Sequence, residues 1–204
     1  AQIIVVRIAD LVEKKAALAS LSGEKISFID SISVNIQGGF EFKLENHSSG
    51  IYRLTFNNNN PSLQSIAETS WLDFIYDNEV IEIETDTNNI LDSLKVIQSE
   101  SNKIYYEFIK LNKDYKTKTE LLQLILARYP EADDYYLTTK EKLIQVQEEY
   151  LYFVNVTAQA NHNSFVARYV RYAQLPVIDI EIPIEEQLKY LKTHALDYVN
   201  FYDD

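Results

Sequence analysis

Carboxylates form the densest group of side chains that could do chemistry, and six of them fall within residues 73–86. These are Asp73, Asp77, Glu79, Glu82, Glu84 and Asp86. Glu82 and Glu84 are two positions apart in an alternating segment, so they would point the same way from a strand and could share a cation or act as an acid/base pair. Like-charged neighbours on a wet strand face also keep a sheet edge soluble, and we favour this second interpretation.

The three histidines do not form a metal-binding pattern. His47, His162 and His194 are far apart, and none has a ligand partner three or four residues away on a helix. Nucleotide-binding glycine loops and nucleophile elbows are missing, as are cysteines. We therefore expect no metal, no cofactor and no catalytic residues in this chain.

Tyrosine is unusually frequent, with 15 residues in 204. Two adjacent pairs, Tyr105-Tyr106 and Tyr135-Tyr136, would each place one ring toward a helical core and one about 100° away. Such outward rings suit a partner surface for a sugar or a protein, because tyrosine combines apolar area with a polar tip. The alternative is that these rings cover the seam between helices and sheet, with their hydroxyls in water.

Composition limits the class of protein. With 46% hydrophobic and 25% charged residues, the chain is typical of a globular protein, and no segment has the roughly 18 uninterrupted apolar residues of a membrane span. Its net charge of −12 repels phosphate backbones, so we expect no nucleic-acid partner. The chain begins Ala1-Gln2 and has no Met, from which we infer that it is a processed or cut piece.

The first half of the chain alternates with the period of strands. Apolar positions recur at Ile32-Val34-Ile36, Phe40-Phe42-Leu44 and Tyr52-Leu54-Phe56, and later in WLDFIYD and VIEIETD. Gly38-Gly39 predicts a tight hairpin turn, Ser49-Gly50 another reversal, and the asparagine-rich residues 57–61 a solvated loop. The in-phase aromatic rings therefore belong to the core, because an exposed apolar row of that length is rarely tolerated. We expect about seven or eight strands by Asp86, enough for an antiparallel sheet or sandwich.

From residue 98 onward the period becomes helical. Ile104, Phe108, Leu111 and Tyr115 begin a three- and four-residue spacing that runs to Tyr129, and Pro130 with the acidic residues after it suits a new helix start. The short break predicts a long helical hairpin. Asn163 would cap a third helix and Pro183 would open a last one. Strands before helices give an α+β fold, with a β-rich module at 1–97 and a helical region at 98–204.

Several segments together resemble a known bacterial arrangement. They are Ile29-Asp30-Ser31, Gly39-Phe40-Glu41-Phe42, Gly50-Ile51-Tyr52-Arg53-Leu54 and Ile81-Glu82-Ile83-Glu84-Thr85-Asp86. Roughly residues 1 to 115 resemble the N-terminal region that precedes a thioredoxin-like domain in secreted thiol–disulfide oxidoreductases of the TlpA/AhpC-TSA type. The resemblance implies a periplasmic or cell-surface location and redox chemistry in a downstream Cys-x-x-Cys domain. No catalytic residue can be carried over, because this chain has no cysteine.

Three functions follow as hypotheses. The first is a non-catalytic module that positions a downstream thioredoxin-like domain or recruits its protein clients. The second is a surface module that binds glycans or peptides through outward tyrosines and acidic strands. The third, ranked last, is an enzyme that uses paired carboxylates such as Glu82 and Glu84, since paired acids are common on solvated faces.

Overall fold

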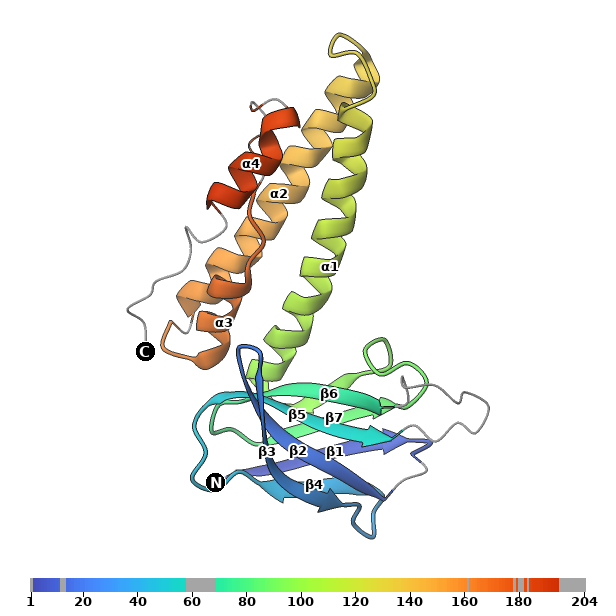
Figure 1. Ribbon diagram of the computed structural model, residues 1–204, viewed down its shortest axis with the longest axis vertical. Coiled ribbons are helices and arrows are strands. Elements are labelled where there is room, and N and C mark those ends of the chain that lie inside the picture. The colour runs from blue at the N-terminus through green and yellow to red at the C-terminus, as the bar shows by residue number, and fades with distance from the viewer. Residues whose placement is uncertain are drawn as a thin grey trace. The chain divides into compact units, whose positions relative to one another are not determined.

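The computed structural model describes residues 2–11, 14–57, 69–160, 162–177, 179, 182 and 184–194. The chain divides into two compact units, Ala1–Tyr105 and Tyr106–Asp204, which are described separately (Figure 1). Strands end at Gln98 and the first helix begins at Glu100. The compact units part a few residues later, because the first turn and a half of that helix is held by the β unit. The expected α+β order, strands before helices, is confirmed.

The β unit contains eight strands among its described residues, arranged as two four-stranded sheets. Sheet A has the order β4-β1-β7-β8 and sheet B the order β3-β2-β5-β6. The strand bounds are β1 Ile3–Ala9, β2 Lys15–Ser22, β3 Lys25–Ser33, β4 Gly39–Lys43, β5 Gly50–Asn57, β6 Thr69–Tyr76, β7 Ile81–Asp86 and β8 Lys95–Gln98. Pairing is antiparallel except between β1 and β7, which run parallel. The expectation of an antiparallel arrangement was wrong for this pair.

The two glycine turns connect the sheets and do not close hairpins. Gly38 has a φ of +82° and supplies the predicted turn, yet β3 pairs with β2 and β4 pairs with β1. Only one isolated bridge, Val34 to Phe40, joins the two sides of that turn among the described residues. The turn before Gly50 likewise leads from sheet A to sheet B. Alternation identified the strands, but it could not show which strands pair. The loop predicted over 57–61 lies outside the described residues beyond Asn57.

The inner faces of the two sheets form the core of the β unit. Phe40, Tyr52, Leu54 and Phe56 are buried as expected, and the Phe42 and Phe74 rings meet across the sheets at 6.1 Å. Other fully buried members are Ile4, Val6, Leu72, Phe74, Ile81 and Ile83. Ile36 was expected in the same inward row but is fully exposed, because it lies in the turn after β3.

The helical unit is built on the predicted hairpin. Helices α1, Glu100–Leu126, and α2, Asp134–Ala160, run antiparallel, with the Tyr115 and Tyr150 rings stacked at 4.1 Å. Helix α3, Phe165–Ala173, is capped by Ser164, one residue after the predicted Asn163. Helix α4 spans Ile184–His194, and Pro183 lies outside the described residues. No helix in the described part of the chain has the length and apolar character to cross a membrane.

Candidate functional site

The strand register of sheet B separates an inner face from an outer face. Residues directly opposite one another in antiparallel strands share a face, so the pairs Ala19–Arg53 and Arg53–Asp73 continue a row that begins at Phe28. A second row runs from Ile26 through Leu21 and Ile51 to Ile75. Both rows lie on the side away from the core, since the neighbouring Leu18, Leu54 and Leu72 are buried on the inner side.

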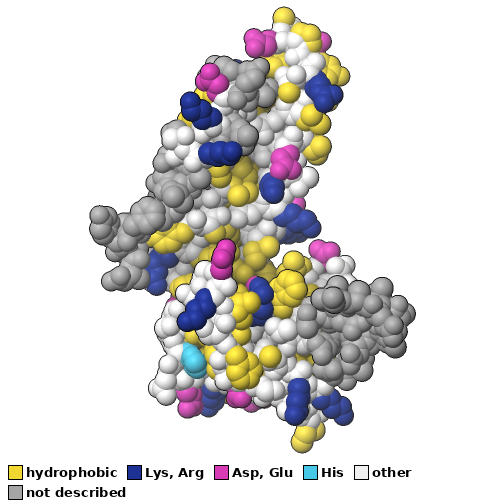
Figure 2. Space-filling view, in the orientation of Figure 1, with side chains coloured by type: hydrophobic (Ala, Val, Ile, Leu, Met, Phe, Trp, Pro, Cys, Tyr) yellow, Lys and Arg dark blue, Asp and Glu magenta, His cyan; other side chains and the backbone are white. Residues whose placement is uncertain are grey.

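Large apolar side chains on this outer face remain in contact with solvent. Ile26 is 59% exposed, Phe28 69% and Trp71 52%. Together with the half-buried Leu21 they make up what we term the outer apolar face of sheet B. In Figure 2, hydrophobic side chains reach the surface of the β unit among polar and charged ones. Ile26, Phe28 and Leu21 are neighbours on β3 and β2, whereas Trp71 lies on β6 across the same face. Contiguous exposed apolar groups mark interaction surfaces, and the β2–β3 end of this face carries such a group.

A β-bulge explains why the sequence pattern missed this face. Leu18 pairs with Asp30 and Ala19 with Phe28, so Ile29 is an extra residue in β3. An extra residue reverses the face to which all following side chains point. Ile26 and Phe28 therefore point outward, although simple alternation places them in phase with Ile32. Asp30, which interrupts the apolar alternation, was the available signal.

The charged groups on the outer face satisfy each other. Arg53 donates two hydrogen bonds to the Asp73 carboxylate, at 2.6 and 2.7 Å, and its guanidinium lies 4.9 Å from the centre of the Trp71 ring. The hydrogen bond from Arg53 to Asp73 raises the pKa of the arginine. Arg53 and Asp73 thus neutralise each other between the exposed apolar side chains, an arrangement suited to contact and not to proton transfer.

The predicted acid pair lies on the outside of sheet A, with an arginine between its members. The parallel register sets Arg7 opposite Glu84 and Val5 opposite Glu82. Arg7 donates a hydrogen bond to Glu82 and another, at 3.4 Å, to Glu84. The Glu82 hydrogen bond raises the pKa of Arg7. This arrangement gives the two carboxylates a structural partner, in keeping with the interpretation of a solvated strand face.

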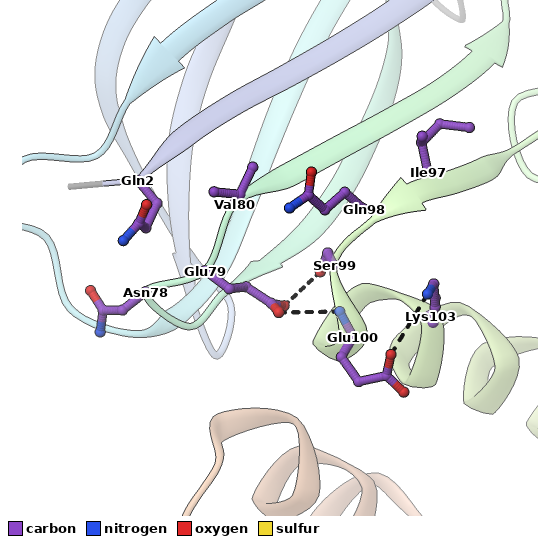
Figure 3. Close-up of a pocket in the computed structure, with 9 residues that line it drawn as sticks. All are labelled: Gln2, Asn78, Glu79, Val80, Ile97, Gln98, Ser99, Glu100 and Lys103. Carbon is purple, nitrogen blue, oxygen red and sulfur yellow. Dashed lines mark hydrogen bonds and ion pairs between the residues drawn. The ribbon is translucent and has the colours of Figure 1, made fainter.

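An open pocket of about 380 Å³ lies where β8 passes into α1 (Figure 3). Its principal acid, Glu79, is occupied by the start of the helix. The carboxylate accepts hydrogen bonds from Ser99 Oγ at 2.6 Å and from the backbone N–H groups of Glu100 and Ser101 at 3.1 and 3.0 Å. A carboxylate at a helix N-terminus satisfies N–H groups that otherwise lack partners. We therefore interpret Glu79 as a helix cap and not as a ligand for a substrate.

The same junction closes one edge of sheet B. The fully buried Asn102 accepts from Ile75 N and donates to Ile75 O, both at 2.8 Å, as a neighbouring strand would. Its amide also donates to Ser99 Oγ at 2.7 Å. Ser99 has a φ of +146°, which non-glycine residues rarely adopt. These bonds hold the strained residue and fasten the start of α1 to β6.

The four candidate tyrosines do not form one surface. Tyr105 is buried within the β unit, whereas Tyr135 is exposed and meets the Tyr129 ring at 4.9 Å where α1 turns into α2. Tyr106 and Tyr136 are half-buried. Because α1 and α2 are antiparallel, Tyr106 and Tyr135 are roughly 30 Å apart along the hairpin. At the Tyr129–Tyr135 end of the hairpin, two outward rings touch.

The histidines are also separate in space. His47 is exposed and meets the edge of the Tyr52 ring at 6.2 Å, and His162 is exposed in the turn after α2. Nothing is described of the His194 side chain. In the described part of the chain, no three histidine or acidic side chains gather in a way that could hold a metal ion.

Comparison with known proteins returned no match for this chain, either among protein-family models or among curated proteins.

Proposed function

We propose that this chain is a non-catalytic binding module of a secreted bacterial thiol–disulfide oxidoreductase. Disulfide exchange requires a thiolate, and this chain has no cysteine, so the reacting thiols would belong to a thioredoxin-like domain elsewhere in the same protein. The module would position that domain or recruit its protein clients, in the periplasm or at the cell surface.

The observation that carries the proposal is the outer apolar face of sheet B. Ile26, Phe28 and Trp71 remain exposed on a sheet whose other face buries Leu18, Leu54, Leu72 and Phe74. An aromatic and aliphatic surface of this kind is typical of protein-binding sites.

The charged side chains support a binding role over a catalytic one. Glu82 and Glu84 share Arg7, Asp73 is paired with Arg53, and Glu79 caps α1. The resemblance segments fall in β3, β4, β5 and β7, where they supply core residues and turns of the sandwich. They are therefore a signature of the fold and not of a reaction centre.

The complete coding sequence and the kinetics of its product test this proposal. We expect a Cys-x-x-Cys domain in the same reading frame, and we expect the present chain alone to give no turnover of insulin or DTNB. In the complete protein, Phe28→Ser should raise the KM for a disulfide-bonded protein client, whereas Ile97→Ser on sheet A should not. A complete reading frame without that motif, or turnover by this chain alone, would contradict the proposal.

A further inference from the structure

The two edges of sheet B are finished differently. On the β6 edge, Asn102 bonds both backbone groups of Ile75. Strand β3 forms the opposite edge, and with β2 it makes the long blue hairpin of Figure 1. No hydrogen bond among the described residues reaches the backbone of Ile26 or Phe28 from outside the sheet. An edge strand without a partner is a template for another extended chain.

The register shows which backbone groups face outward from β3. Gly23 and Glu24 form a two-residue loop, with Gly23 at a φ of +57°, so the closing pair Ser22–Lys25 is the hydrogen-bonded one. Hydrogen-bonded and non-bonded pairs alternate along an antiparallel ladder. The pairs of Ile26 and Phe28 with β2 are then non-bonded, and the N–H and C=O of both residues point to the open edge.

The same two residues carry the exposed side chains of this edge. Ile26 and Phe28 both project from the outer face, and Ser27 between them projects from the inner side. A strand added along β3 would therefore form backbone hydrogen bonds with Ile26 and Phe28. Every second side chain of the added strand would lie on the outer face, where it could contact the Ile26 and Phe28 side chains. The bulge at Ile29 ends the regular ladder, so the added segment would be short and would pair with Lys25–Phe28.

We propose that β3 binds an extended peptide segment with apolar side chains at alternate positions, as an added antiparallel or parallel strand. This inference rests on the proposed function only in that the partner is a polypeptide. A peptide fits better than a glycan, because sugar hydroxyls require hydrogen-bonding side chains, and Arg53 and Asp73 on this face already bond each other. An added strand has backbone donors and acceptors that can pair with the outward N–H and C=O groups of the β3 edge.

The single tryptophan provides a reporter for this binding. Trp71 is the only tryptophan of the chain and lies on β6, three strand spacings or about 14 Å from β3 across the same face. A dansyl-labelled hexapeptide of alternating Thr and Val should quench Trp71 by energy transfer in a saturable way. The same peptide N-methylated at alternate residues, so that its edge-facing N–H groups are removed, should bind roughly tenfold more weakly or not at all.

Matched variants of the protein separate the edge from other exposed surfaces. Ile26→Ser should weaken binding several-fold, whereas Ile97→Ser, at an isoleucine of similar exposure on the edge strand of sheet A, should leave it unchanged. Equal binding of methylated and unmethylated peptides would overturn the inference, as would no saturable binding up to about 1 mM peptide or binding of glycans that depends on Phe28. Because this assay needs no thioredoxin-like domain, its failure leaves the proposed oxidoreductase context standing, and a missing Cys-x-x-Cys domain would leave a positive result standing.

Discussion

Strands β6 and β3 are the two edges of one sheet, and they differ in the burial of their side chains and in the hydrogen bonding of their outer backbone groups. Behind β6 lie the buried side chains of Leu72, Phe74 and Tyr76, and Asn102 closes its edge at Ile75. Strand β3 turns the side chains of Ile26 and Phe28 toward solvent. Among the described residues, no group outside the sheet forms a hydrogen bond with the backbone of either residue. Both strands are rich in apolar residues, so composition does not cause the difference.

The β6 edge of sheet B is closed by hydrogen bonds from a side chain, and the β3 edge shows no such bond among the described residues. The device is a side-chain amide at the start of α1, held by Ser99 and by the cap from Glu79. Within the described ranges, the β3 edge is limited by the bulge at Ile29 and by the charges of Lys25 and Asp30, which are common protections against uncontrolled pairing. The bulge and the charges limit how many residues of β3 can pair with another strand, while the exposed side chains of this stretch are apolar. Such an edge is suited to selective pairing.

The largest expected effect is on stability and distinguishes the two strands directly. Phe74→Ala removes a fully buried ring beneath β6 and should lower the free energy of unfolding by about 3–5 kcal/mol. Phe28→Ala on β3 should change it by no more than about 0.5 kcal/mol. Urea unfolding of both variants measures the difference. Equal losses would show that Phe28 is packed and would remove the outer apolar face.

Opening the closed edge should have an intermediate effect. Asn102→Ala leaves the N–H and C=O of Ile75 without their partners and should lower the free energy of unfolding by about 1–3 kcal/mol. Asn88→Ala, at an exposed position of the β7–β8 turn, serves as the control and should be nearly neutral. Unchanged stability and an unchanged exchange rate of the Ile75 amide would contradict the role assigned to Asn102.

The smallest expected effect comes from the titration of Tyr52, whose ring stacks on Phe74 at 6.0 Å on the inner side of the sheet. Burial raises the pKa of Tyr52 above its usual value near 10, with a further rise from Tyr76 and an opposing hydrogen bond to Ser48. Below about pH 10 the phenol is neutral in both folded and unfolded chains, so it adds no pH dependence. Above that pH the unfolded chain loses the proton first, and the free energy of unfolding falls as pH rises. Tyr52→Phe should make this fall shallower in unfolding curves between pH 9 and 11, and an unchanged slope would contradict the assignment.

Much of the fold could be predicted from the sequence, because local periodicity determines it. The inward row of Tyr52, Leu54 and Phe56, the α1–α2 hairpin and the α+β order all follow from spacing alone. Strand pairing could not be predicted in this way, since β1 pairs with β7 across more than seventy residues. The two glycine turns look like hairpins locally, although the strands on either side belong to different sheets.

The candidate site depended on features that alternation does not show. One extra residue, Ile29, reverses the faces of Ile26 and Phe28, and the bond from Asn102 to Ile75 joins positions 27 residues apart in sequence. The tyrosine pairs were identified from frequency and helical spacing. That reasoning could not tell that Tyr105 lies inside the β unit or that Tyr135 lies at the far end of the hairpin from Tyr106.

Amide hydrogen exchange on both edges, with and without the unmethylated Thr-Val peptide, tests the central claim most directly. We predict that the Ile26 and Phe28 amides exchange rapidly in the free chain and slowly when peptide is bound, while the Ile75 amide is protected in both states. Protection of Ile26 and Phe28 in the free chain, or no gain in protection at saturating peptide, would contradict the claim that β3 is an open edge that receives a strand.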